Sequence, residues 1–315
     1  MMQRVTINRI GAKGDGVAET GSGPIFIPRG IPGDVFQINS DRAAETPYIL
    51  EHPSSHRVAP LCNVFGICGG CTLQEADQRT YLQWKKGLVE TALAPLGLSD
   101  RVTNFIDAHG VGRRRVTFHA RRRDGDIVIG FMRQKSHDVI DLETCPVLVP
   151  PLQTCAPVLK PIARLLLKSE KPIDLAVTAT LSGLDMDIRG HGPASPELRM
   201  KLTREAERLD LARLSLHGDI IVERRAPQIR VGKAEVIVPP GSFLQATETG
   251  EATLQREVLA HLREPKRIVD LFSGIGTFAL RLAEQAGVHA VESEASSLHA
   301  LSRATRDVTG LKPLT

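Results

Sequence analysis

Four cysteines could together hold a metal ion or a metal–sulfur cluster. They are Cys62, Cys68, Cys71 and Cys145, and the first three stand within a short glycine-rich run. A thiolate cage needs several soft ligands near one point, and the spacing Cys68-x-x-Cys71 wraps one turn of backbone around such a point. The residues alone leave zinc and an iron–sulfur cluster open. The alternative is that buried cysteines only fill a core, which we prefer for Cys155.

A second chemical motif is the segment Asp270-Leu-Phe-Ser-Gly274-Ile-Gly276-Thr-Phe-Ala279, with Glu292 further along. Read loosely, it fits a dinucleotide-binding loop between a strand and a helix. Asp270 argues against NAD, because its carboxylate would repel a pyrophosphate. The same carboxylate suits a cofactor with a sulfonium and an amino group, while Glu292 can accept both ribose hydroxyls. We therefore favour S-adenosylmethionine over NAD and over an empty structural loop.

A basic segment, residues 112–123, has the alternation of a strand. Val116, Phe118 and Ala120 fall on one face, and Arg115, His119 and Arg121 fall with Thr117 on the other. Arginine suits bidentate contacts with phosphate. We interpret this face as a candidate RNA-binding ridge, although a charged strand face is often only solvated.

The elements that must position these residues fall into three predicted domains. Residues 1–55 show short strands separated by glycines and predict a small OB-like β-barrel. Residues 56–240 predict a central α+β domain that carries the cysteines, with a helix starting at the capping-box sequence Thr72-Leu-Gln-Glu75. Residues 241–315 predict a strand–helix–strand unit of a Rossmann-like α/β domain, with one more helix after it.

Composition places the chain among soluble proteins. It has 315 residues, 42% of them hydrophobic, a formal net charge of +4, and no apolar run long enough to cross a bilayer. The N-terminus lacks the apolar segment of a secretion signal. We expect a cytoplasmic monomer with reduced thiols and no membrane contact.

In this order, the barrel-like start, the cysteine run with a late Cys145-Pro146, the segment Gly241-Ser-Phe-Leu-Gln245 and the Asp270 loop resemble the bacterial RNA uracil-C5 methyltransferases. The closest resemblance is to the 23S ribosomal RNA enzymes that carry a TRAM domain and a [4Fe-4S] cluster. The resemblance implies that the four cysteines bind the cluster. It also implies that Gln245, Phe272 and Glu292 contact S-adenosylmethionine, with Thr277 standing where the family often has asparagine.

The resemblance also exposes a difference. Methylation at C5 of uracil needs a thiolate that adds to C6 and a base that removes the C5 proton. In the family the thiolate lies in a Ser-Cys-Asn-Pro segment, which this chain does not contain. We therefore expect a truncated methyltransferase, binding without turnover and lacking a catalytic residue. The alternative is an RNA-binding module with TRAM domain and cluster and no catalysis; a radical enzyme is disfavoured by the cysteine spacing.

Overall fold

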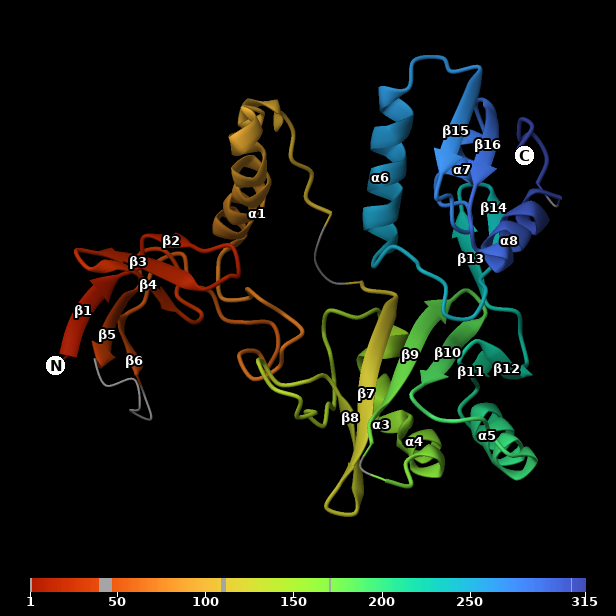
Figure 1. Cartoon of the computed structure of the whole chain (residues 1–315), viewed down its shortest axis with the longest axis horizontal. Coiled ribbons are helices and arrows are strands. Elements are labelled where there is room, and N and C mark those ends of the chain that lie inside the picture. The colour runs from red at the N-terminus through yellow and green to blue at the C-terminus, as the bar shows by residue number, and fades with distance from the viewer. Residues whose placement is uncertain (1, 40–46, 109–111, 170, 307) are drawn as a thin grey trace. The chain divides into compact units, whose positions relative to one another are not determined.

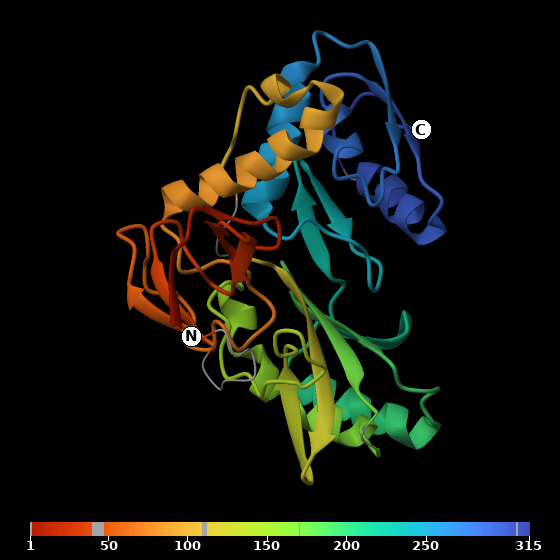
Figure 2. The same ribbon diagram turned by 60° about the vertical axis from the view of Figure 1, so that its left-hand side comes forward.

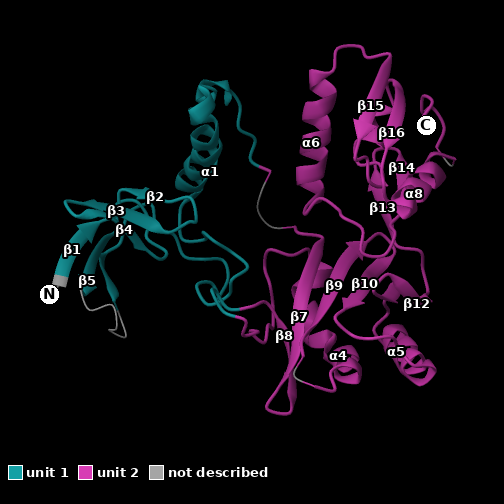
Figure 3. Ribbon diagram, viewed as in Figure 1, with its two compact units in different colours: residues 1–107, 133–136 teal, residues 108–132, 137–315 magenta. Residues whose placement is uncertain are grey.

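The computed structural model describes residues 2–39, 47–108, 112–169, 171–306 and 308–315. The chain forms two compact units, which Figure 3 separates by colour. Unit 1 contains residues 1–107 and 133–136, and unit 2 contains residues 108–132 and 137–315. The predicted division into three domains stays a prediction. Among the described residues, no helix is both long and apolar enough to span a membrane.

Unit 1 is built on two small antiparallel sheets. Strands β1 (Met2–Thr6), β5 (Val35–Asn39) and β6 (Tyr48–His52) form one sheet, and β2 (Arg9–Ile10), β3 (Gly16–Thr20) and β4 (Gly23–Ile27) form the other. The apolar side chains that alternate along these strands meet in one core, made of Val5, Ile7, Ala18, Ile27, Phe36 and Ile38. The strands predicted from the glycine-punctuated sequence are present. The closed barrel is wrong for the described residues, since strand pairing leaves two separate three-stranded sheets.

Helix α1 (Gln78–Leu93) does not begin at the predicted capping box. Its N-cap is Asp77, whose carboxylate accepts a hydrogen bond from the Thr80 amide at 2.7 Å. Glu75, the acidic residue of the expected box, instead forms ion pairs with Arg29 and Arg57 and is buried. Because its carboxylate is already paired with two guanidinium groups, it does not cap the helix.

The larger part of unit 2 is a six-stranded sheet with the strand order β12-β11-β10-β9-β7-β8. Its strands are β7 (Arg115–Arg123), β8 (Asp126–Gly130), β9 (Ile173–Thr180), β10 (Gly183–Arg189), β11 (Arg213–Leu216) and β12 (Asp219–Glu223). All neighbours are antiparallel except β10 and β11. Helices α2 (Pro150–Gln153), α3 (Cys155–Val158), α4 (Lys160–Leu166) and α5 (Pro196–Arg208) pack on it, and α4 contacts α5 (Figure 1, Figure 2).

The last part of unit 2 contains the predicted strand–helix–strand unit. After the hairpin of β13 (Gln228–Val231) and β14 (Ala234–Ile237), the chain forms α6 (Glu248–His261), β15 (Arg267–Leu271), α7 (Ala279–Leu282), β16 (Gly287–Val291) and α8 (Ala295–Arg306). Strands β15 and β16 are parallel. Buried residues of the hairpin, the loop at Leu244, α7, β16 and α8 share one core. This packing fixes the carboxyl ends of β15 and β16 side by side.

Candidate functional site

Two carboxylates mark the shared edge of β15 and β16. Asp270 is paired with Ala290 across the parallel strands, and Glu292 follows the last residue of β16. The carboxyl ends of parallel strands are where open α/β sheets bind their ligands. The loop between β15 and α7 lies against this edge, because the Ser273 amide donates to the carbonyl of Val291 at 3.1 Å. The structure thus brings together the two acidic residues that the sequence singled out.

Glu292 is held by backbone amides from two sides. Its Oε2 accepts from the Gly274 amide at 2.9 Å and its Oε1 accepts from the Glu294 amide at 2.9 Å. These hydrogen bonds favour the ionised form and lower the pKa of the Glu292 carboxyl. A carboxylate has more acceptor sites than these two bonds use, so a pair of ribose hydroxyls can still bind it.

Asp270 places a carboxylate at the start of α7, the helix end where a dinucleotide-binding fold holds its pyrophosphate. Its carboxylate accepts a hydrogen bond from the amide of Ala279, the first residue of α7, while burial raises its pKa. A negative group already stands at the start of this helix, so a second anion would be repelled. The geometry therefore disfavours a dinucleotide and suits a ligand with positive charge.

Two polar atoms in this loop are buried without a partner among the described residues. They are Oδ2 of Asp270 and Oγ of Ser273. Buried polar atoms in native proteins are nearly always hydrogen-bonded, so such a pair indicates groups that meet a ligand. Ser273 was not among the predicted site residues; its position inside the glycine loop was the signal that could have identified it. An orphaned carboxylate oxygen and hydroxyl fit the amino group and hydroxyls of S-adenosylmethionine.

The backbone of the loop is shaped by unusual dihedral angles. Phe272 has φ of 60° and its side chain is 89% exposed, which leaves the ring open for stacking on a planar base. Gly276 has φ of 97°, and a Cβ there would lie 2.4 Å from Cδ1 of Leu301. Gly274 has φ of 56° and faces open space. Thr277 contributes its backbone carbonyl to a hydrogen bond from Nε2 of Gln255 at 2.8 Å.

Gln245 lies on a loop that is held by Arg114, the residue just before strand β7. Nε of Arg114 donates to the carbonyl of Gln245 at 3.2 Å, and the Arg114 amide donates to the carbonyl of Ala246 at 2.8 Å. Arg115, the first residue of β7, places its guanidinium 4.7 Å from the ring centre of Phe243. Strand β7, which the sequence predicted to face RNA, is therefore in direct contact with the loop of residues 241–247 that carries Gln245.

The other members of the basic ridge have acidic partners. Nδ1 of His119 lies 2.7 Å from Oδ1 of Asp174, and Arg121 lies 3.9 Å from Asp138. Phe118 and Ala120 are fully buried, as the alternation predicted. The charge of the ridge is thus partly neutralised. Arg115 is the member of the ridge that contacts the loop of residues 241–247.

The cysteine run lies in unit 1. Burial raises the pKa of the Cys68 thiol, with smaller contributions from Cys71 and Cys62, and the Gly70 amide donates to its sulfur at 3.4 Å. Gly66 has φ of 84°, a left-handed conformation that glycine adopts without strain.

Cys145 lies in unit 2, where it is buried and its amide donates to the carbonyl of Gln153. In the chain as described, no three His, Cys, Asp or Glu side chains form a group that could hold a metal ion. The predicted [4Fe-4S] cluster therefore has no support among the described residues.

Cys155 behaves as the core cysteine that was predicted. It is 4% exposed, and burial raises the pKa of its thiol to about 11. A thiol with this pKa is almost entirely protonated at neutral pH and is a poor nucleophile. Cys155 therefore has a packing role.

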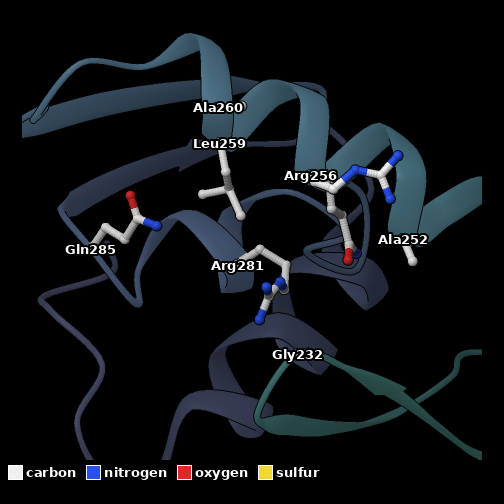
Figure 4. A pocket seen from close by; sticks show the side chains of 8 residues that line it. Gly232, Ala252, Arg256, Leu259, Ala260, Arg281 and Gln285 are labelled. Atoms are coloured by element: carbon white, nitrogen blue, oxygen red, sulfur yellow. The ribbon is translucent and has the colours of Figure 1, made fainter. Parts of the chain in front are cut away.

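A hollow of about 510 Å³ opens between α6 and the segment 281–285 (Figure 4). Arg256 and Arg281 line it together with Gln255 and Gln285. It contains none of the predicted cofactor residues, although Gln255 also bonds the backbone of Thr277. Nη1 of Arg281 lies 2.6 Å from Oε1 of Glu284, so the charge of this arginine is paired within the chain.

The amino-acid sequence is similar to bacterial proteins that are named as RNA methyltransferases. The chain is 43% identical over 311 residues to an uncharacterized RNA methyltransferase of Brucella suis biovar 1, covering 99% of the chain and 75% of that relative. It is 38% identical to an uncharacterized RNA methyltransferase of Caulobacter vibrioides, covering all of the chain and 78% of the relative. It is 28% identical to a 23S rRNA (uracil(1939)-C(5))-methyltransferase of Vibrio vulnificus, covering 90% of the chain and 68% of that protein. A search of protein-family models found no match.

A solved structure supports the fold. The tRNA (uracil-54, C5)-methyltransferase of Pyrococcus abyssi, in complex with S-adenosyl-L-homocysteine, superposes with a TM-score of 0.69 at 19% identity. The match covers 99% of this chain and 78% of that one. The expectation of a truncated, inactive chain gains no support from these comparisons; the chain spans 75% of the Brucella suis relative and 78% of the Pyrococcus abyssi enzyme.

Proposed function

Because the chain belongs to the RNA methyltransferase family of its bacterial relatives, we propose that it transfers the methyl group of S-adenosylmethionine to C5 of a uracil in RNA, with 23S ribosomal RNA as substrate. We name the cofactor, the base and the atom, and assign no cysteine of the chain as the thiolate that adds to C6. The observation that carries the proposal is the pair Asp270 and Glu292 at the carboxyl ends of two parallel strands, on either side of a glycine loop. The similarity to enzymes named for uracil C5 supports the choice of base and atom.

Each residue of the site has a defined part in this proposal. S-adenosylmethionine supplies an electrophilic methyl group on a sulfonium. Glu292 would accept the ribose hydroxyls, Phe272 would stack on the adenine, and the orphaned atoms of Asp270 and Ser273 would bind the amino acid end of the cofactor. Gly274 and Gly276 would let the backbone approach it closely.

The RNA would lie along the ridge that begins at Arg115. Arg115 contacts Phe243 on the loop of residues 241–247, which also carries Gln245, so a nucleotide bound there would lie beside the methyl donor. His119 and Arg121 extend the ridge along the same strand, where phosphate would compete with Asp174 and Asp138 for them. A cytoplasmic monomer and a TRAM-like contribution of unit 1 to RNA binding go with this proposal.

The test begins with binding and proceeds to the product. We expect isothermal calorimetry to show one S-adenosylmethionine site per chain and no binding of NAD. Incubation with transcribed 23S rRNA should then give 5-methyluridine, measured by mass spectrometry of the digested nucleosides, with transfer RNA as the comparison substrate. Binding of NAD in place of S-adenosylmethionine would refute the cofactor, and methylation of another base or atom would refute the reaction.

A further inference from the structure

A buried ion pair joins the residue just before strand β7 to helix α6, next to the loop of residues 241–247. Nη2 of Arg114 lies 2.7 Å from Oε2 of Glu251, and both residues are 4% exposed. Burying two charges is costly, so such a pair is poor evidence for stability by itself. Burial raises the pKa of the Glu251 carboxyl and Arg114 opposes that shift, which indicates that the carboxylate depends on this one arginine.

The same guanidinium holds the backbone of the loop that carries Gln245. While Nη2 of Arg114 bonds Glu251, its Nε donates to the carbonyl of Gln245. The planar fork of arginine can make both bonds at once, whereas the single ammonium of lysine cannot reproduce their geometry. The Arg114 amide also bonds Ala246, and Arg113 pairs with Thr247.

Both ends of this loop are fixed, and one side chain is left open. Leu244 is buried in the core of unit 2, and Thr247 caps α6 by accepting from the Gly250 amide at 3.0 Å. Among the described residues, the structure gives the side-chain amide of Gln245 no hydrogen-bond partner, only its carbonyl. Arg114 therefore sets the backbone of Gln245 and leaves its amide to meet a ligand.

We propose that Arg114, oriented by Glu251, is a positioning residue for S-adenosylmethionine: it fixes the loop of residues 241–247 so that Gln245 presents its amide to the methyl donor. This role rests on the proposed function, because it assumes that Gln245 contacts the cofactor. Arg114 itself does not touch the cofactor; it acts through the backbone that it holds.

Arg114→Lys is the direct test, and Arg57→Lys is its matched control. Arg57 also pairs with a buried carboxylate, that of Asp34, but it is itself half-buried and lies in unit 1. Both variants should lower Tm. Only Arg114→Lys should speed amide hydrogen exchange in residues 241–247 and weaken S-adenosylmethionine binding, by about ten-fold in Kd at a temperature where both proteins are folded. Glu251→Gln, which keeps the shape of the side chain, should show the same two effects to a smaller degree.

The readouts separate the ways in which the idea can fail. Unchanged exchange and unchanged Kd in a folded Arg114→Lys protein would overturn the positioning role, as would equal losses in Arg57→Lys. If Arg114→Lys does not fold, Glu251→Gln decides by the same two measurements. Failure of the wild-type chain to bind S-adenosylmethionine would refute the proposed function instead, and the exchange measurement would still report whether Arg114 orders the loop.

Discussion

The Asp270 loop of unit 2 and the cysteine run of unit 1 were both singled out by residue type and spacing. The structure supports a binding site at the loop and shows no metal-binding group at the cysteine run among the described residues. Asp270 and Glu292 lie at the same edge because Asp270 is near the end of β15, Glu292 directly follows β16, and the two strands are paired in parallel. The cysteines lie outside regular strands and helices, and the described residues show no shared metal-binding group. Backbone pairing carries residues distant in sequence to one place, whereas spacing within an irregular segment does not by itself place sulfur atoms around a point.

The largest expected effect is on the cofactor loop. Asp270→Asn removes the charge that would attract the cationic cofactor while keeping the hydrogen bond from Ala279 within reach. We expect about 100-fold weaker S-adenosylmethionine binding, close to 2.7 kcal/mol. Calorimetry measures the change, and Asp219→Asn, at an exposed position on β12, is the control. An unchanged Kd would remove Asp270 from the site.

The next effect concerns the backbone of the same loop. In Gly276→Ala the new Cβ would lie 2.4 Å from Leu301 at a left-handed φ, so we expect a loss of about 2 kcal/mol in the free energy of unfolding. Gly274→Ala has a left-handed φ but open space, and should cost about 1 kcal/mol. Urea denaturation compares the two. Equal losses would mean that the clash with Leu301 is relieved by movement of its side chain.

Glu292→Gln should have a smaller effect on binding. The amide oxygen can still accept from Gly274, but the NH₂ group cannot accept from Glu294 or from a ribose hydroxyl. We expect about ten-fold weaker S-adenosylmethionine binding, close to 1.4 kcal/mol. Glu235→Gln on β14, where the carboxylate pairs with Arg230, should leave Kd unchanged. A loss as large as that of Asp270→Asn would show that both carboxylates bind the same charged group.

The smallest effect tests unit 1, next to the cysteine run. Hydrogen bonds from Thr80 and His56 lower the pKa of Asp77 from 3.8 to about 2. Since the folded pKa lies below the unfolded one, this carboxylate stabilises the fold above pH 4, and the contribution disappears as pH falls from 4 to 2. Asp77→Ala should therefore lower Tm slightly at pH 6 and leave it unchanged near pH 2. An equal decrease at both pH values would mean that the capping charge is irrelevant.

These contrasts also show what the sequence could reveal. The alternation of apolar residues predicted most strands, and the Asp270 loop with Glu292 was found because strand–loop–helix order is local. Barrel closure was not predictable, because it depends on which strands pair across unit 1. The start of α1 was missed because Glu75 is engaged by Arg29 and Arg57, one of them distant in sequence. Ser273 and the pair Arg114 and Glu251 were missed for a similar reason: their importance comes from burial, which spacing does not encode.

The contact between the start of strand β7 and the loop of residues 241–247 has a thermodynamic consequence. Arg114 bonds the carbonyl of Gln245, and the next residue, Arg115, contacts the ring of Phe243. The predicted RNA-binding ridge, which begins at Arg115, is therefore in contact with the loop of residues 241–247. If RNA bound at Arg115 restricts this loop, it changes the affinity for S-adenosylmethionine, and linkage requires that the donor change the affinity for RNA by the same factor. The two substrates would then bind with cooperativity, although neither needs to touch the other.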